Sequence, residues 1–599
     1  MITPMTKYSF ILLNGEQDAL LEKIQEFGLM DITRSTKPLD EKSQKLAGEI
    51  ELLDGLLNSI RKAEIPEGTQ AQAYKGEGSD DIIRLAGGTL MLFTESRNKV
   101  QTLEKEIRNS EVWGSFDSDI VQKLSEAGVP LHFHIVSPKA FQESWKDEYV
   151  LTVISRRKAG IYFVVFGEDN LPGEVPAPKE DCEGRKDLLA QEKKKLKKLE
   201  GEMAYLKEQL PELEKVRDKA YSRLDLYMAG VSAVPAAENT IVTLVGYAPS
   251  ESDETISDAL ERAGVLYLKD SAVAEDNPPI QLRNNWFVRQ FELLTDMYGR
   301  PDYNEFDPTP YISVFFLLFF AMCMGDAGYG LVLVIGGFLL RKVEGMKDLA
   351  PLVTILGVGT FVVGIVMHTV FGVDIATLPW IPAWLKSVMI TGTIAGFEAQ
   401  MVLALVIGVV HLCLAMVVKT VYATRNKGFL GSLGTWGWTL LIVGGVVLAA
   451  MSMFLAIPAP IFKWTVIGLG IVSALGIFLF NDIKRNPLKN IGSGLWETYN
   501  TVTGLLGDVL SYLRLYALGL AGGMLGKAFN DIATMTLGDG GFGWFFFIVI
   551  LIVGHALNLA MCCLGAFVHP LRLNFLEFFK NSGYDGKGRL YRPVKKYIF

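Results

Sequence analysis

The pattern of hydrophobic and polar positions changes near the middle of the chain. Up to residue 294, short β-rich stretches alternate with helical stretches in which apolar residues recur every three or four positions. Beyond residue 295, apolar runs that are long enough for membrane helices follow one another. The 599-residue chain therefore predicts an N-terminal domain over 1–294 and a membrane domain over 295–599.

The N-terminal part predicts two small α/β lobes joined by an antiparallel helical rod. Two helical stretches, 46–60 and 196–213, place leucines and isoleucines at heptad spacing between Lys and Glu residues, which is typical of a coiled coil. Pro211 is expected to bend the second stretch without ending it. Strands are expected on either side of these stretches, at 7–13, 129–137, 149–157, 160–168 and 241–249.

The C-terminal part contains seven apolar runs. They cover 311–340, 350–372, 397–421, 431–456, 461–481, 491–535 and 543–576. The first run contains Gly325-Asp-Ala-Gly and, if it is a tight pair of crossings broken there, the total becomes eight. Eight crossings place the basic loops on the cytoplasmic side and leave little beyond Lys386 on the other. We therefore expect a polytopic α-helical membrane domain of about eight helices, the last two long and tilted, behind an α/β and coiled-coil domain.

Composition supports this division and excludes several classes of protein. Hydrophobic residues make up 50% of the chain and charged residues 21%, and the mean hydropathy is +0.26. Residues 1–294 carry a net charge of −13 and residues 295–599 one of +5. A simple soluble enzyme, a collagen and a disordered chain are excluded. The N-terminus lacks the pattern of a signal peptide, so we expect the N-terminal domain to be cytoplasmic.

Ionisable residues gather in the last two apolar runs. An arginine deep in a bilayer costs about 3 kcal/mol on insertion scales, so Arg514 and Arg572 are functional candidates. No acid lies one turn from Arg514 on its own helix, so its counter-charge must come from another helix or another protein. The alternatives are a structural ion pair for Arg514 and snorkelling to headgroups for Arg572. His569 shares a face with Arg572, and Pro570 is expected to bend this segment.

Several motifs together resemble one family, the membrane stator subunit of V-type and archaeal-type rotary ATPases, called a or, in bacteria and archaea, I. The motifs with the arginines are Leu510-Ser-Tyr-Leu-Arg-Leu-Tyr-Ala-Leu-Gly-Leu-Ala and His569-Pro-Leu-Arg-Leu-Asn-Phe-Leu-Glu-Phe-Phe. The others are Asn277-Pro-Pro, Leu282-Arg-Asn, Phe291-Glu-Leu-Leu-Thr-Asp-Met-Tyr-Gly, Asp307-Pro-Thr-Pro and Phe319-Phe-Ala-Met-Cys-Met-Gly-Asp-Ala-Gly-Tyr-Gly. The resemblance extends over the whole chain. Its length is similar to that of the shorter prokaryotic members, which implies a prokaryotic origin.

The resemblance implies a mechanism of ion translocation. Arg514 and Arg572 would attract a carboxylate of a rotating proteolipid ring, with His569 beside them, while ions enter and leave through two offset half-channels. The possible lining residues are Asp326, Glu398, Glu497, Asp508 and Glu577. A purely structural role is an equal alternative for Asp326, Glu398 and Glu577. Pro570 and Cys562 depart from the family pattern, and Cys562 stands where some members carry an acid.

The resemblance also implies partners and a location. The partners would be the proteolipid c/K ring, the peripheral stalk subunits E and G, the central-stalk cap subunit d/C, other V-ATPase subunits and the lipid bilayer. The protein would lie in the plasma membrane as a multi-pass subunit, with its N-terminal domain and its C-terminus in the cytoplasm. No cofactor, metal or nucleic acid is implied, and the choice between H⁺ and Na⁺, like that between pump and synthase, stays open.

Two other functions stay open beside the stator of a rotary ATPase. One is a secondary transporter with a cytoplasmic regulatory domain, although such transporters often show an internal repeat and none is visible. The other is a membrane scaffold that transports nothing. The chain has no Walker A motif, so we expect a non-catalytic subunit rather than an ATP-hydrolysing enzyme.

Overall fold

The structure is a computed structural model of the chain. It describes residues 1–13, 15–34, 40–66, 68–72, 79–113, 118–157, 160–167, 170–176, 182–236, 240–343, 345–379, 381–394, 396–454, 458–480, 487–538 and 542–595. The chain forms two compact units, one of Met1–Phe10 with Val245–Pro593 and one of Ile11–Leu244 with Val594–Phe599. The domain boundary at residue 294 stays a prediction.

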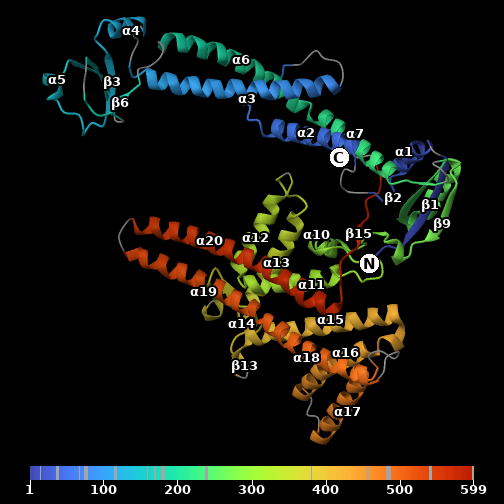
Figure 1. The fold of residues 1–599 in the computed structure, drawn as a ribbon. Helices are drawn as coiled ribbons and strands as arrows, with labels where there is room; N and C mark the ends of the chain where they lie inside the picture. The colour runs from blue at the N-terminus through green and yellow to red at the C-terminus, as the bar shows by residue number, and fades with distance from the viewer. Residues whose placement is uncertain are drawn as a thin grey trace. The chain divides into compact units, whose positions relative to one another are not determined.

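The second unit contains the helical rod (Figure 1). α3 (Ser79–Ser110) packs along α6 (Cys182–Glu208), and α2 (Glu41–Lys62) packs along α7 (Leu210–Val231). The heptad positions of the second predicted stretch are buried in this rod, as expected for a coiled-coil seam; they include Leu199, Met203, Leu206 and Leu213. The sequence analysis did not single out α3, which supplies Phe93 to the same core.

Two details of this unit concern the sequence predictions. The prediction for Pro211 is wrong, because α6 ends at Glu208 and α7 starts afresh at Leu210 with Pro211 in its first turn, where a proline costs no hydrogen bond. One sheet of this unit has four strands, which pair antiparallel in the order β4-β5-β3-β6. These strands are β3 (Leu131–Val136), β4 (Leu151–Arg157), β5 (Gly160–Phe166) and β6 (Glu174–Val175).

A second sheet is built from both ends of the N-terminal region. Its strands run in the order β2-β8-β1-β9, with β7 beside β8. They are β1 (Met5–Leu13), β2 (Asp31–Ile32), β7 (Val234–Ala236), β8 (Ile241–Pro249) and β9 (Tyr267–Ser271). The two sheets, with the helices between them in the sequence, confirm the α/β and coiled-coil fold predicted for this part.

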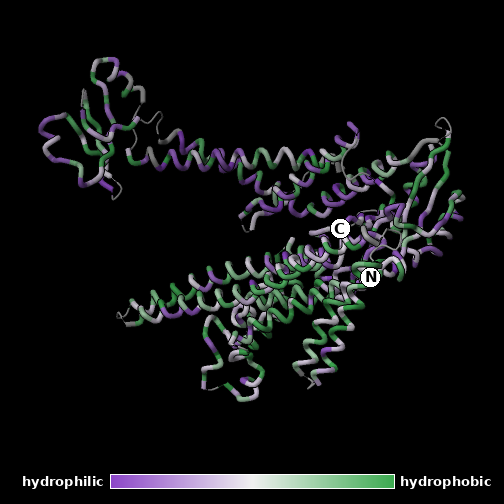
Figure 2. The backbone as a smooth tube through the Cα atoms, turned by 60° about the horizontal axis from the view of Figure 1, so that its bottom comes forward, coloured by the Kyte–Doolittle hydropathy of each residue, from purple (hydrophilic) through white to green (hydrophobic). Residues whose placement is uncertain are grey.

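The first unit contains the apolar helices, which stand out by their hydropathy from the polar helices of the rod (Figure 2). Five helical segments of the described chain are long and apolar enough to cross a membrane, namely Ala399–Gly431, Leu433–Met453, Ala459–Phe478, Asn490–Met535 and Gly543–Ser582. Three shorter apolar helices precede them: α11 (Thr309–Met324), α12 (Ala327–Leu340) and α13 (Ala350–Val366). Together they match the predicted number of about eight.

The first apolar run is broken where the sequence predicted, but its halves do not form a tight pair. α11 ends at Gly325, which adopts a left-handed conformation with φ 58°, and Asp326 caps α12. α12 packs along α13 instead, and α11 packs against α13, α19 and α20. Glycine allows the α12–α13 packing, since a Cβ on Gly330 would lie 2.4 Å from the Phe361 backbone nitrogen.

The last two segments are long and irregular. α18 (Pro487–Ser511) and α19 (Leu513–Met535) are separated at Tyr512, which is fully buried and lies 2.9 Å through its hydroxyl from His411 Nδ1. α20 (Gly543–Arg572) continues through Pro570 and then widens into the π-helical turn η5 (Leu573–Phe578). The irregularity that Pro570 predicted therefore appears as a wider turn directly after the helix.

Candidate functional site

Arg514 lies in the first turn of α19, immediately after the break at Tyr512. Its Nη1 is buried and has no hydrogen-bond partner among the described residues. No carboxylate of the described chain forms an ion pair with it. The face of α19 that carries it is otherwise apolar and exposed, with Ala517, Ala521 and Leu525 at helical spacing. Arg514 is thus a single cation on an exposed apolar face.

His569 and Arg572 lie on α20, close to Arg514. The imidazole of His569 lies within electrostatic reach of both guanidinium groups, and its buried Nδ1 has no hydrogen-bond partner among the described residues. Arg572 is exposed and makes no ion pair within the part of the chain that the structure describes. The structure therefore brings together the three residues that the sequence analysis singled out for ion translocation.

Two of the candidate lining carboxylates, Asp508 and Glu577, form a second cluster between the end of α18 and the π-helical turn η5. Asp508 on α18 accepts a hydrogen bond from Asn581 Nδ2 at 2.8 Å and lies 3.7 Å from Lys580 Nζ. Glu577 in η5 is buried and lies within electrostatic reach of Asp508 and Arg572, and its Oε2 has no hydrogen-bond partner among the described residues. Glu497 lies about three turns before Asp508 on the same face of α18.

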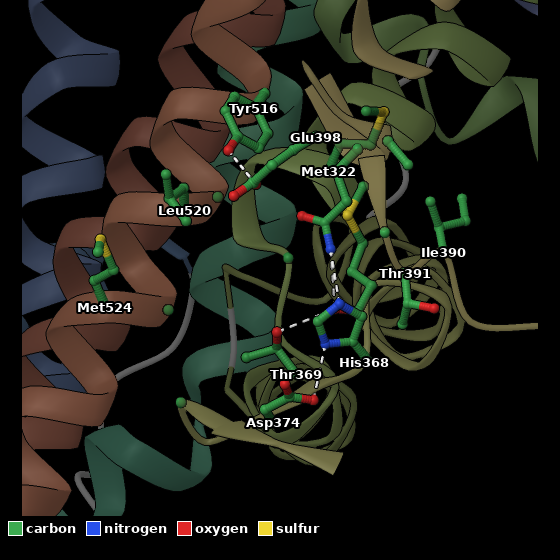
Figure 3. A pocket seen from close by; sticks show the side chains of 18 of the residues that line it. Met322, His368, Thr369, Asp374, Ile390, Thr391, Glu398, Tyr516, Leu520 and Met524 are labelled. Atoms are coloured by element: carbon green, nitrogen blue, oxygen red, sulfur yellow. Dashed lines mark hydrogen bonds and ion pairs between the residues drawn. The ribbon is translucent and has the colours of Figure 1, made fainter. Parts of the chain in front are cut away.

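Glu398 lies elsewhere, beside a cavity of about 500 Å³ between α19 and the segment that joins α13 to α15 (Ala399–Gly431). Tyr516 donates a hydrogen bond to its carboxylate (Figure 3). His368 also lines the cavity, with Nδ1 3.0 Å from Asp374 Oδ1 and Nε2 3.2 Å from Gln400 Nε2. Titratable side chains thus surround an open space on the face of α19 that lies opposite Arg514.

Asp326 has a different environment. It is 1% exposed, and its carboxylate accepts hydrogen bonds from four backbone amides at 2.8 to 3.2 Å: Gly328 and Tyr329 in α12, and Phe371 and Gly372 in the β11–β12 turn. Strands β11 (Thr369–Val370) and β12 (Val373–Asp374) form this hairpin. All four hydrogen bonds join Asp326 to backbone amides of α12 and of the β11–β12 turn, so the geometry supports the structural alternative for Asp326.

The sequence analysis missed a polar network in the core of this unit. It consists of Tyr329, Asn530, His555 and Asn558, which hydrogen-bond to one another across α12, α19 and α20. One signal was available, because His555, Asn558, Cys562 and His569 are spaced by three, four and seven residues and so share one face of α20. Tyr329, the member of the network on α12, has no such spacing of polar residues within its helix.

Comparisons with known proteins agree on one family. A model of the "V-type ATPase 116kDa subunit family" matches residues 170–350. The chain is 26% identical to V-type ATP synthase subunit I 1 of Treponema pallidum, over 100% of both chains. It is 33% identical to A-type ATP synthase subunit I of Pyrococcus abyssi over 58% of this chain and 53% of the relative, and 30% identical to that of Methanocaldococcus jannaschii over 69% and 65%. The chain belongs to the V-type ATPase subunit I family.

The residues that the family model matches, 170–350, belong partly to each of the two units. A solved structure titled as the cytoplasmic N-terminal domain of subunit I aligns with 45% of the chain at 14% identity and a TM-score of 0.21. The apolar helices and the family together identify a multi-pass membrane subunit of a V-type ATPase complex. The matched residues 170–350 end before α18, so the arginine site lies beyond the family model.

Proposed function

We propose that this chain is the stator membrane subunit of a rotary ATPase, which couples ion translocation to ATP hydrolysis or synthesis without catalysing either itself. The observation that carries the proposal is Arg514, whose buried Nη1 has no hydrogen-bond partner and whose guanidinium has no counter-charge among the described residues. Leaving a charge buried and unpaired is costly, so a partner from another chain stabilises it. A carboxylate of a proteolipid ring passing along the exposed apolar face of α19 supplies that partner transiently.

The interaction is strong enough to hold a carboxylate ionised and weak enough to be reversible. At about 4 Å, two unit charges attract each other by roughly 4 kcal/mol at an effective dielectric constant of 20. Desolvation of both groups offsets part of this gain, so the carboxylate leaves when protonation or an ion is offered. Arg572 adds a second cation on α20, within electrostatic reach of His569.

The two groups of carboxylates are suited to two offset half-channels. The cavity beside Glu398 would open on the extracytoplasmic side, since the segment between α13 and α15 that lines it has Lys386 as its one Lys or Arg residue, whereas cytoplasmic loops are richer in basic residues. The cluster of Asp508 and Glu577, with Glu497 further along α18, would serve the cytoplasmic side. No hydrogen bond or ion pair among the described residues joins the two groups, so an ion would pass from one to the other by travelling on the ring.

The exposed apolar face of α18 supports a docking role for this region. Large side chains recur on it every three or four residues and are 53% to 69% exposed; they are Trp496, Tyr499, Val502, Leu506 and Leu510.

The N-terminal domain would anchor the peripheral stalks of subunits E and G, and the complex would lie in the plasma membrane with both the N-terminal domain and the C-terminus in the cytoplasm. The central-stalk cap subunit would be a further partner.

The experiment that tests the proposal replaces Arg514. We expect Arg514→Ala to abolish ATP-driven ion uptake into vesicles while the complex still assembles, because the ring carboxylate loses its counter-charge. Arg514→Lys should also be severely impaired, since lysine lacks the planar guanidinium fork. Arg572→Ala should be damaging but less so, because Arg572 is exposed.

Assembly is the control for this experiment. Purification of each variant should yield the proteolipid and the ATPase subunits in wild-type amounts. Near-normal uptake by assembled Arg514→Ala would refute the proposed role. Failure of the wild-type chain to purify with a proteolipid and an ATPase would favour a secondary transporter or a scaffold instead.

A further inference from the structure

The helix that carries Arg514 is interrupted immediately before it. At Tyr512 the backbone departs from the regular α-helix, because its N–H donates to the Val509 carbonyl at 3.2 Å and the Leu515 N–H donates to the Tyr512 carbonyl at 3.1 Å. Both hydrogen bonds join residues three apart, as in a 3₁₀ turn, and this turn separates α18 from α19. The place of Arg514 in the first turn of α19 therefore depends on how Tyr512 is held.

Tyr512 is held by α15. Its side chain is fully buried, and its hydroxyl oxygen lies at hydrogen-bond distance, 2.9 Å, from Nδ1 of His411. Gly408, one turn earlier on α15, makes room for the ring, since a Cβ on Gly408 would lie 2.3 Å from Tyr512 Cγ. A larger residue there would displace the tyrosine. One turn of α15 thus fixes both the ring and the hydroxyl of Tyr512.

His411 is itself fixed by aromatic rings. It is fully buried, and its imidazole stacks on Phe315 of α11, with ring centroids 4.2 Å apart, and on Phe578 of η5, with centroids 4.7 Å apart. Phe319 packs edge-on to it at 5.1 Å. A buried side chain packed among three rings cannot change its rotamer without displacing them. His411 therefore offers Tyr512 a partner in a fixed place.

α15 contacts α19 again one turn after Tyr512. Tyr516 donates a hydrogen bond to Glu398, the residue directly before α15 (Figure 3). Tyr512 and Tyr516 are four residues apart, so they share one face at the start of α19. Arg514 lies two residues from each of them and so on the opposite face. The tyrosine contacts thus fix the turn from which Arg514 projects.

The guanidinium of Arg514 has no comparable support of its own. Within the described chain no hydrogen bond or ion pair holds it, and its buried Nη1 has no hydrogen-bond partner there. Its position therefore follows the backbone of α19, and the tyrosine contacts with α15 determine where that backbone starts.

We propose that His411 and Tyr512 are positioning residues, which hold Arg514 at the distance at which it attracts a ring carboxylate; this rests on the proposed stator function. Without the contact between them, the first turn of α19 can shift. At an effective dielectric constant of 20, an increase in the distance between the charges from about 4 Å to about 5 Å weakens their attraction enough for the carboxylate to bind its ion roughly fourfold more tightly. The ion is then released less readily.

The test measures how strongly released ions inhibit transport. Vesicles with assembled complex are loaded with increasing concentrations of H⁺ or Na⁺, and the initial rate of ATP-driven uptake is measured per complex. We expect Tyr512→Phe, which keeps the ring and removes the hydroxyl, to lower the internal ion concentration that halves uptake by about fourfold. A mere loss of folded protein would reduce uptake equally at every concentration and leave this midpoint unchanged.

Two variants of His411 test the other side of the contact. His411→Leu removes both ring nitrogens, so we expect the same shift of the midpoint as in Tyr512→Phe. His411→Asn places an amide atom, which can hydrogen-bond, close to the position of Nδ1. This conservative variant should restore the wild-type midpoint.

Tyr422→Phe is the matched control, because it removes a tyrosine hydroxyl from α15 itself, and the Tyr422 hydroxyl makes no hydrogen bond within the described residues. It should keep the wild-type midpoint. A wild-type midpoint in Tyr512→Phe, or an equal shift in Tyr422→Phe, would overturn the positioning role. If Arg514→Ala is inactive in the same assay, the stator function would survive that outcome, whereas near-normal uptake by Arg514→Ala would refute both proposals.

Discussion

At the scale of single residues, the carboxylates of the apolar helices differ in how many of their oxygens already accept hydrogen bonds within the chain. Asp326 is fully used by four backbone amides, whereas Glu577 keeps a buried oxygen without a partner in the described chain. The sequence placed both among the possible half-channel residues, because it shows the charge and not its hydrogen-bond partners. Only the fold brings the β11–β12 turn to Asp326, from about 45 residues along the chain.

We predict that Asp326→Asn destabilises the subunit rather than blocking transport. The asparagine oxygen can still accept from α12, but the NH₂ group replaces the oxygen that accepts a hydrogen bond from the Gly372 amide. That amide is left without its acceptor, at a cost of roughly 1–3 kcal/mol. Thermal unfolding of the purified complex in detergent measures this loss, and transport per assembled complex should fall much less. Normal stability together with abolished transport would instead make Asp326 a channel residue.

At the scale of elements, the sequence predicted the local structure well and the pairing poorly. The strands at β1, β3, β4, β5 and β8 and the break at Gly325 were expected, since alternation and turn residues mark them. The α12–α13 packing was not, because an apolar helix shows no preferred face by hydrophobicity when all its sides are apolar. The Tyr329–His555 contact escaped prediction for the same reason.

We predict that glycines at this helix contact cannot be enlarged. A Cβ on Gly330 would lie 2.4 Å from a backbone atom of α13, whereas one on Gly336 would meet nothing within 4 Å. Gly330→Ala should therefore destabilise the subunit by about 1–3 kcal/mol through overpacking. Gly336→Ala in the same helix is the control and should be neutral or slightly stabilising. Equal melting temperatures for the two variants would contradict the packing.

At the scale of the whole molecule, the order of apolar helices determines which charged residues share a side of the membrane. Lys342 follows α12, and Lys386 ends α14 (Ala383–Lys386), so α13, with 17 residues, is the apolar helix between them. α15 then separates Lys386 from Arg425, which lies in its last turns. The positive-inside rule favours the cytoplasm for Lys342 and Arg425.

We predict that single cysteines at 342 and 425 are labelled from the cytoplasmic side and one at 386 from the other side. The measurement uses a membrane-impermeant thiol reagent on vesicles of known orientation, in a chain without its five native cysteines. Activity of the cysteine-free chain is the control. Labelling of 342 and 386 from the same side would show that α13 does not cross.

The shortness of α12 has an electrical consequence. Its 14 residues span about 21 Å, against about 30 Å for the hydrocarbon layer. A bilayer thins, or polar groups enter it, where a crossing helix is too short. The insulating layer beside such a helix is then thinner, and the same voltage falls over a shorter distance. Charge that moves beside α12 would therefore experience a steeper electric field than charge that moves beside the longer helices.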